Sequence, residues 1–266
     1  AGLLEPAQPI YVVELAAGHG KFSFFFLQEL LELKSASPLR HLDIRYVMAD
    51  FAEANLAAWD AQPLFEPFRE AGVLDSARFD LENPGELTLR RAGITLGKNS
   101  LRNPLVVFGN YIFDTVPHDL FRVQNRQLLQ GLVSLRDPVG ASADLSSPTT
   151  LARLIADFGY APLADKPYYG DRELDALLDE YREVLADTDF LIPIAVIKCL
   201  RKLGELCGDR LLVIASDKGF THLDEMFFQR GEHVQYHGSF SCMVNFHALG
   251  RLFSRRGGSA LFDKKR

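Results

Sequence analysis

Short apolar runs, separated by turns and helical patterns, dominate the first half of the chain. Ile10–Leu15 is an almost continuous apolar run that is too short for a helix, so it predicts a buried strand. A glycine-containing turn at Ala17–Gly20 closes it, and Phe22–Leu33 then carries large apolar residues at helical spacing. Strand, glycine turn and helix therefore follow one another directly, as they do at the start of a βαβ unit.

Further runs of strand length recur along the chain, with helical patterns such as Phe51–Trp59 and Phe246–Phe253 between them. In chain order these predicted strands are Leu42–Ala49, Ala77–Phe79, Pro104–Gly109, Leu211–Ala215, Ser239–Val244 and Ser259–Phe262. Strands that alternate with helices indicate a parallel sheet covered on both faces. We therefore expect an α/β fold with a doubly wound, mostly parallel sheet of seven strands.

The middle of the chain breaks this alternation. Leu120–Leu135 holds two β-like runs around Gln124–Arg126, which predicts a hairpin, and Asp137–Ala164 is rich in Pro, Gly, Ser and Ala. Asp165–Asp189 has nine acidic and three basic residues, but its leucines share one helical face, so we interpret its acids as the solvated face of an amphipathic helix. We expect a substrate-facing insertion or cap at residues 120–190, between the two parts of a main domain at residues 1–119 and 191–266.

Composition and charge exclude several classes of protein. The chain has 266 residues, 47% of them hydrophobic, and a formal net charge of −6, which argues against a nucleic-acid partner. No apolar run approaches the roughly 18 residues that a membrane span needs. The three cysteines are far apart and form no CxxC pair, which fits neither a disulfide scaffold nor a structural zinc site. We expect a soluble, cytoplasmic protein with no membrane partner.

The glycine turn carries the candidate chemistry. The motif that contains it, Glu14–Lys21, runs from the end of the strand to the start of a helix, where free N–H groups can meet a ligand. A phosphate-binding P-loop would need Gly at position 15 and Ser or Thr at position 22, but these are Leu15 and Phe22. A dinucleotide motif would place its third small residue at Ser23, and it would leave the acid inside the strand unexplained.

S-adenosylmethionine accounts for more of this pattern. Glu14 can face the cationic and amino end of the cofactor, and the backbone at Gly18–Gly20 can pack against it. Asp50 closes the second strand, and the acid at this position of doubly wound folds accepts both ribose hydroxyls. Asp80 closes the third strand and can accept a hydrogen bond from the adenine amine. Asn110 follows the fourth strand, at the edge where ligands of parallel sheets bind.

Structural alternatives stand beside these interpretations. Asp50 and Asp80 could be ordinary helix N-caps, and Asn110 could be a turn residue.

The motifs together resemble the class I S-adenosylmethionine-dependent methyltransferases, and within them the MidA-like branch. That branch includes mitochondrial complex I assembly factors that methylate arginine on a partner subunit. The resemblance implies a Rossmann-like methyltransferase fold, S-adenosyl-L-methionine as the cofactor and a protein as the methyl acceptor. The segments that carry it are Tyr11–Leu30, Tyr46–Leu56, Ala77–Asp80, Gly109–Val123 and Leu211–Gly219. The cofactor-binding residues that it implies are Glu14, Ala16, Gly18, Gly20, Asp50, Phe51, Asp80, Leu81 and Asn110.

Two positions depart from the family pattern. Ala16 replaces the glycine that is usual in the acidic motif, and Tyr111 follows Asn110 directly, where MidA-like proteins usually have Glu. A guanidinium is best held and deprotonated by a carboxylate, so the residue at position 111 counts against an arginine acceptor.

Methyl transfer from a sulfonium is an in-line displacement, so positioning and one base for the acceptor's proton suffice. The catalytic candidates are Asn110 for positioning, Tyr111 as a polar wall or hydrogen-bond partner, and Asp114 or His118 as the base. The structural alternatives are a helix cap for Asp114 and an exposed position for His118. No metal is required, and the pair His233 and His237 lies in a predicted loop-to-strand segment, so we expect no metal site.

We therefore expect an S-adenosylmethionine-dependent methyltransferase that acts on a protein side chain. The alternative is a non-catalytic S-adenosylmethionine-binding module that serves in protein assembly or interaction, which Tyr111 favours. A nicotinamide-dependent oxidoreductase is a third and weaker hypothesis.

Overall fold

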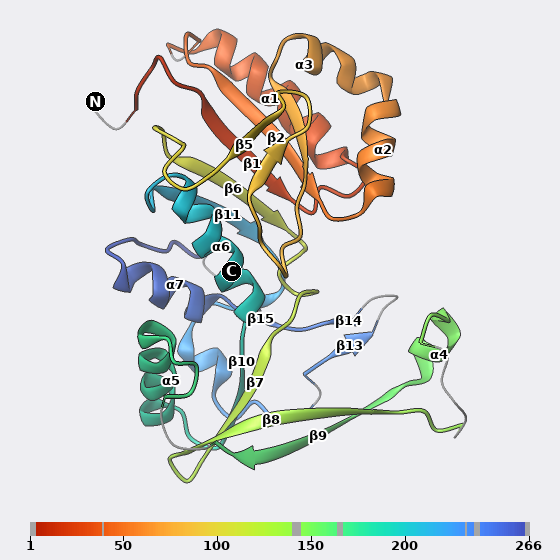
Figure 1. The fold of residues 1–266 in the computed structure, drawn as a ribbon. Helices are drawn as coiled ribbons and strands as arrows, with labels where there is room; N and C mark the ends of the chain where they lie inside the picture. The colour runs from red at the N-terminus through yellow and green to blue at the C-terminus, as the bar shows by residue number, and fades with distance from the viewer. Residues whose placement is uncertain are drawn as a thin grey trace. The chain divides into compact units, whose positions relative to one another are not determined.

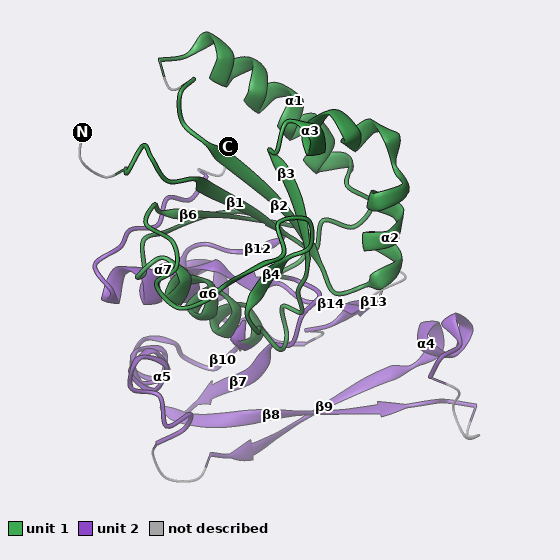
Figure 2. Cartoon of the chain, turned by 45° about the horizontal axis from the view of Figure 1, so that its top comes forward, with its two compact units in different colours: residues 1–113, 195–217 green, residues 114–194, 218–266 purple. Residues whose placement is uncertain are grey.

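The computed structural model describes residues 4–38, 40–139, 145–163, 167–231, 233–236 and 240–263. The chain divides into two compact units, and each is made of two stretches of sequence (Figure 2). The first unit comprises residues 1–113 and 195–217, and the second comprises residues 114–194 and 218–266.

A five-stranded parallel sheet forms the centre of the first unit (Figure 1). Its strands lie in the order β11-β6-β1-β2-β3, and every neighbouring pair is parallel. The three inner strands β6, β1 and β2 are mostly apolar, which suits strands that are covered on both faces. The bounds are β1 Ile10–Leu15, β2 Ile44–Asp50, β3 Leu74–Arg78, β6 Leu105–Asn110 and β11 Leu211–Ser216.

Three helices and a 3₁₀ turn pack against one face of this sheet. They are α1 (Lys21–Ala36), α2 (Glu53–Ala61), η1 (Pro63–Phe65) and α3 (Glu66–Glu70). Their core side chains, such as Leu27, Trp59 and Phe68, form one cluster with Tyr46 and Met48 of β2. The remaining elements of the unit are α6 (Ile194–Leu206) and the antiparallel pair β4 (Leu87–Leu89) and β5 (Ile94–Leu96).

The opposite face of the sheet is buried as well. Val13, Val47 and Val107 belong to three neighbouring strands and are fully buried there. The inner strands are therefore buried on both faces, as is typical of parallel strands, whereas Leu212 and Ile214 of the edge strand β11 are exposed.

The second unit is built on a four-stranded antiparallel sheet in the order β10-β7-β8-β9. The hairpin turns at Asn125 and Arg126, which both have positive φ. The sheet strands are β7 (Asp119–Gln124), β8 (Gln127–Arg136), β9 (Ile155–Pro162) and β10 (Thr188–Ile192). The helical elements are α4 (Pro148–Arg153), α5 (Arg172–Val184), η2 (Leu223–Met226) and α7 (Phe246–Arg255). Two short strand pairs complete the unit: β12 (Gly219–Phe220) pairs with β15 (Val244–Asn245), and β13 (Gln235–Tyr236) pairs with β14 (Phe240–Ser241).

The predicted α/β fold with a parallel central sheet is confirmed, but the expected seven strands are not found in it. In the described residues the sheet has five strands. The expected strand at Ser239–Val244 is divided: Phe240–Ser241 pairs antiparallel with β13, and Val244–Asn245 pairs with β12. Residues 259–262 form no strand; Leu261 is 97% exposed, and Phe262 lies next to Gly250 of α7.

The inserted region also differs in detail from its prediction. The hairpin at Leu120–Leu135 and the amphipathic helix within Asp165–Asp189 are both present. The segment that looked like irregular cap, Asp137–Ala164, contains strand β9, which pairs along the whole of β8 from Leu129. The two compact units group residues 195–217 with residues 1–113 and residues 218–266 with residues 114–194. The expected division into residues 1–119, 120–190 and 191–266 stays a prediction.

Within the described residues, no helix combines the length and the apolar character that crossing a bilayer needs.

Gly20 is the position in the glycine turn that cannot carry a side chain. Its φ is +79°, and an added Cβ would lie 2.7 Å from Met48 Cε and 2.8 Å from Phe65 Cζ. We expect Gly20→Ala to lower the free energy of unfolding by about 2–4 kcal/mol in urea denaturation, because strain and overpacking act together. Gly18→Ala is the matched control: its φ is +56° with the nearest atom at 4.0 Å, so it should cost only about 1 kcal/mol. Equal losses would contradict the packing role of Gly20.

Candidate functional site

The predicted cofactor residues lie at the carboxyl ends of four neighbouring strands of the first unit. Asn110 ends β6, Ala16–Gly20 follow β1, Asp50 ends β2, and Asp80 lies two residues after β3. Because parallel strands end at the same edge of a sheet, the fold brings these four segments to one edge. The sequence predicted this order, and the topology places it in space.

The turn after β1 is held in a left-handed conformation. Ala16, Gly18 and Gly20 all have positive φ, at 49°, 56° and 79°. A side chain makes this conformation costly, which explains why glycine is usual at position 16 in the family that the motif resembles. The turn delivers the chain into α1, whose N-cap residue Gly20 offers no side-chain cap.

Both backbone polar groups of Gly18 are hydrogen-bonded. Its N–H donates to Asp50 Oδ2 at 3.0 Å, and its carbonyl accepts from Trp59 Nε1 at 2.7 Å. Asp50 belongs to β2 and Trp59 to α2, so two separate elements hold the turn. The backbone that a ligand would meet is therefore positioned before any ligand arrives.

Asp50 is a buried residue that stabilises the glycine turn, as well as a candidate for cofactor binding. Besides Gly18, its carboxylate accepts from the Ala52 N–H at 2.9 Å and from Asn55 Nδ2 at 3.0 Å, and the residue is 4% exposed. It does not cap α2, whose N-cap is Ala52. Oδ2 already accepts two bonds and Oδ1 one, so the carboxylate has room for one further donor, not for the two ribose hydroxyls that the sequence suggested.

Glu14 points into the core of the unit. Its carboxylate accepts from the hydroxyls of Ser23 and Tyr46, the latter at 2.6 Å, and the residue is 4% exposed. Burial raises the pKa of Glu14, although the two hydrogen bonds act against this shift. The predicted contact with the amino end of the cofactor stays a prediction, and the described contacts make Glu14 a link between β1, α1 and β2.

Asp80 and its neighbours form the β3 end of the edge. The Asp80 carboxylate accepts from Asn83 Nδ2 at 3.0 Å and from the Glu82 N–H at 2.9 Å, and no helix begins there, so it is a turn residue and not an N-cap. The bond from Asn83 lowers the pKa of Asp80. Leu81 is buried, whereas Phe51, just after Asp50, leaves 65% of its surface exposed.

Asn110 and Tyr111 form the β6 end. Asn110 is opposite Ser216 of β11, and the Tyr111 N–H donates to the Ser216 carbonyl at 2.9 Å. Tyr111 has a φ of 52° and is 72% exposed. A large side chain held in a left-handed conformation and left in solvent has no packing role in its own unit, which makes it a functional candidate.

The two candidates for the base, Asp114 and His118, belong to the second unit. Asp114 caps no helix; its Oδ2 lies 3.8 Å from Lys218 Nζ, and its side chain is 13% exposed. His118 is half-buried, not exposed. Lys218 also donates to Ser241 Oγ at 2.6 Å, and sequence reasoning missed it, although it stands three residues after the predicted strand Leu211–Ala215.

Asp189 organises a buried polar network in the second unit. It was expected on the solvated face of a helix, but it lies in β10 and is 2% exposed. Arg122, its cross-strand neighbour on β7, pairs with it through Nε and Nη2, and Tyr160 OH donates at 2.8 Å. His233 Nε2 lies 2.9 Å from Asp189 Oδ2. Burial acts to raise the pKa of Asp189, but the bonds from Arg122, His233 and Tyr160 outweigh it and hold that pKa well below its ordinary value.

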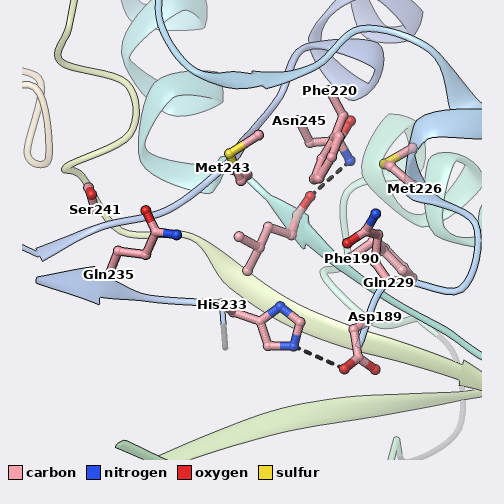
Figure 3. Close-up of a pocket in the computed structure, with 11 residues that line it drawn as sticks. Asp189, Phe190, Phe220, Met226, Gln229, His233, Gln235, Ser241, Met243 and Asn245 are labelled. Carbon is pink, nitrogen blue, oxygen red and sulfur yellow. Dashed lines mark hydrogen bonds and ion pairs between the residues drawn. The ribbon is translucent and has the colours of Figure 1, made fainter. Parts of the chain in front are cut away.

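This network forms one wall of a cavity of about 60 Å³ within the second unit (Figure 3). Asp189 and His233 are at one end, and Gln235 and Ser241, which both accept from Lys218, are at the other. Phe190, Leu191, Phe220, Met226 and Met243 make the rest of the lining mostly apolar.

No metal site is evident in the described residues, where no three His, Cys, Asp or Glu side chains are grouped as ligands. Of the histidine pair considered from the sequence, His233 takes part in the Asp189 network and His237 lies outside the described residues. The cysteines are free thiols: Cys199 and Cys207 are buried, and burial raises the pKa of Cys199 to about 12.

Comparison with known proteins finds structural relatives only. No family model and no curated protein matches the chain. A COG1565 superfamily protein from Burkholderia thailandensis, named as uncharacterized, aligns with a TM-score of 0.54 and 18% identity over 94% of this chain and 58% of its own. A superfamily member from the same organism, named as a "likely methyl transferase" and bound to S-adenosyl-homocysteine, aligns with a TM-score of 0.53 and 18% identity, over 94% and 56%.

The chain shares their fold. It spans less than three fifths of the length of either structure.

Glu14 gives the first unit a stability that depends on pH. The folded chain holds the Glu14 proton more tightly than the unfolded chain. The contribution of Glu14 to the free energy of unfolding is therefore fully present below the ordinary pKa of a glutamate, and it is lost as pH rises through the higher pKa of the folded state. We expect Glu14→Gln to remove this loss, because its side chain has no proton to release. Urea denaturation between pH 4 and 8, about the range where glutamates and buried glutamates titrate, measures it. Parallel stability curves for the two proteins would contradict this role.

The Asp189 network should be worth far more than an exposed ion pair. We expect Asp189→Asn to lower the free energy of unfolding of the second unit by about 3–5 kcal/mol, because Arg122 would keep a charge beside a neutral side chain. Asp157→Asn breaks the exposed pair with Arg136 and should cost less than about 1 kcal/mol. Native-state hydrogen exchange of the β7 and β10 amides measures the loss of stability of the second unit in both variants. Equal effects would show that the network adds no stability.

Proposed function

We propose that this chain is an S-adenosylmethionine-dependent methyltransferase that acts on a protein side chain. The observation that carries the proposal is the Gly18 peptide, held between Asp50 and Trp59 at the carboxyl edge of a parallel sheet and directly before α1. A protein of the same fold was crystallised with S-adenosyl-homocysteine, which supports the same cofactor here at 18% identity.

The glycine turn suits close approach of a cofactor. An added Cβ at Gly18 would meet no atom nearer than 4.0 Å, so the space beside it is open. The first backbone N–H groups of α1 have no partner within the helix, and no side chain caps them. Such donors at a helix N-terminus suit the methionine carboxylate of S-adenosylmethionine.

The neighbouring strand ends suit the nucleoside half. We assign the exposed ring of Phe51 to stacking on the adenine and Asp80 to its amine, with Leu81 as an apolar wall. Asp50 would accept one ribose hydroxyl through Oδ1 while its other bonds hold the turn. The backbone of Ala16, Gly18 and Gly20 would contact the cofactor. Glu14 would hold α1 against β1 from inside the core, through its bond from Ser23.

When bound, S-adenosylmethionine supplies an electrophilic methyl group. Among this chain's residues, Asn110 would position the acceptor and Tyr111 would form an exposed wall beside it. Asp114 is our candidate for the group that takes the acceptor's proton, and the ion pair with Lys218 would orient its carboxylate. His118 is the second candidate.

One observation favours the alternative of a non-catalytic S-adenosylmethionine-binding module. Tyr111 stands where a carboxylate would be expected for an arginine acceptor, and its strained backbone shows that the position is not a free loop. A module of this kind would bind the cofactor through the same edge and serve assembly with a protein partner.

Calorimetric titration of S-adenosylmethionine, S-adenosylhomocysteine and NAD into the chain tests the cofactor. We expect micromolar binding of the two adenosyl compounds and none of NAD. Gly18→Val should abolish binding by filling the open space, and Asp50→Ala should abolish it by releasing the turn. Gly93→Val is the matched control, since Gly93 has a φ of +66° and open space but lies in the β4–β5 turn. Loss of binding in Gly93→Val, or its retention in Gly18→Val, would contradict the assigned site.

Transfer from methyl-labelled S-adenosylmethionine to a library of peptides separates the two hypotheses. Transfer that Asn110→Ala removes without weakening cofactor binding would support the methyltransferase. Binding without any transfer would favour the module.

A further inference from the structure

A second cavity of the first unit lies at the other end of the strands. It has a volume of about 210 Å³ and is lined by Tyr11 and Arg45, the second residues of β1 and β2, and by Leu74 and Asp75 at the start of β3. Arg69 and Gly72 at the end of α3, and Leu89, Arg91 and Ala92 around the β4–β5 turn, complete the lining. The proposed cofactor edge is at the carboxyl ends of the same strands, so this cavity is separate from it.

The strand register explains why polar side chains meet there. Tyr11 is directly opposite Arg45, and Asp75 is opposite Val47, two residues further along β2. All three side chains therefore point to the same face of the sheet, away from the face that packs on α1–α3. The amino ends of three strands thus present a phenol, a guanidinium and a carboxylate side by side.

Asp75 holds the backbone around the cavity in place through its hydrogen bonds. Its Oδ1 accepts from the Arg91 N–H at 2.9 Å and its Oδ2 accepts from the Ala92 N–H at 3.0 Å, while the Ser76 N–H adds a third bond. The carboxylate thereby fixes the β4–β5 turn at the rim of the cavity. That turn places Arg91 in the lining, next to a carboxylate whose accepting capacity is largely filled.

The groups that remain available in the cavity are hydrogen-bond donors. Tyr11 is 6% exposed, yet its hydroxyl makes no hydrogen bond within the described ranges. The Arg91 guanidinium likewise has no hydrogen bond or ion pair to any residue that the structure describes. Arg45 bonds Asp43 through Nε and Nη2 and leaves Nη1 available, whereas Arg69 is fully engaged by Glu66 and two carbonyls.

These donors call for an acceptor that is charged. The Tyr11 hydroxyl is not a fully buried unpaired group, so it can donate to a ligand oxygen without first losing a protein partner. Burial raises the pKa of Tyr11, so the hydroxyl keeps its proton at neutral pH. Asp43 pairs with Arg45 and Glu66 pairs with Arg69, whereas backbone amides bond to Asp75 without removing its charge. Among the described lining residues, Arg91 is the guanidinium that has no ion pair, so it is the group that a ligand oxyanion can pair with.

We propose that this cavity binds a small oxyanion, the phosphate or carboxylate group of a metabolite, between Tyr11, Arg45 and Arg91. Guanidinium groups hold phosphate and carboxylate oxygens in paired hydrogen bonds, and the phenol adds a third donor from β1. The volume exceeds that of the anion head, so part of the organic group fits as well. The site is independent of the proposed methyl transfer, because none of its residues belongs to the cofactor edge.

Titration by NMR with inorganic phosphate, with acetate and with chloride at equal ionic strength tests the site. We expect saturable shifts of the Arg91 and Gly72 amides with a dissociation constant below about 10 mM for phosphate or acetate, and none with chloride. The tighter of the two identifies the group as phosphate or carboxylate. Tyr11→Phe and Arg91→Gln should each weaken binding about tenfold, since each removes one donor to a charged acceptor.

Arg90→Gln is the matched control, because Arg90 neighbours Arg91 but pairs with Asp60 and does not line the cavity. It should bind the anion as the unaltered protein does. Tyr11→Phe keeps the ring and removes only the hydroxyl, so the fold is retained. The proposal is overturned if neither anion saturates, if both variants bind like the unaltered protein, or if Arg90→Gln loses as much. Binding of S-adenosylhomocysteine should stay unchanged in Arg91→Gln, which separates this result from a failure of the cofactor site.

Discussion

The bond from the Gly18 N–H to the Asp50 carboxylate is the constraint on which the rest of the first unit depends. It ties the turn after β1 to the end of β2, and Trp59 of α2 donates to the carbonyl of the same residue, Gly18. A backbone that must meet a ligand exposes polar groups, and these remain ordered only when neighbouring elements fix them. The turn can therefore be open at Gly18 and rigid at the same time.

Glu14 in the first unit and Asp189 in the second are both buried carboxylates, but they differ in chemistry. Glu14 is surrounded by hydroxyls, so burial dominates and its pKa rises. Asp189 faces Arg122 and His233, so charge and hydrogen bonding dominate and its pKa falls. The same type of group thus favours the protonated form in one unit and the ionised form in the other, because only one of them has a cationic partner.

Two kinds of polar site lie at opposite ends of the parallel strands. At the carboxyl ends the strands lead into the glycine turn, Asp50 and Asn110, where the open backbone suits the proposed cofactor. At the amino ends Tyr11, Arg45 and Asp75 meet on the face that α1–α3 leave uncovered. Both sites follow from register, because parallel strands align their equivalent ends and their alternating side chains.

The parallel α/β core, the glycine turn and the polar strand ends could be predicted from the sequence, because apolar runs and turn residues act locally. The sequence by itself did not determine that Asp50 braces Gly18, that Glu14 faces Ser23 and Tyr46, or that Asp189 pairs with Arg122. Gly18 and Asp50 are 32 positions apart, Glu14 and Ser23 are 9 apart, and Arg122 and Asp189 are 67 apart. Only the tertiary arrangement of the elements brings these residues together. The expected sixth and seventh strands failed for the same reason: a short apolar run does not specify its partner, and pairing decides whether it becomes part of the sheet.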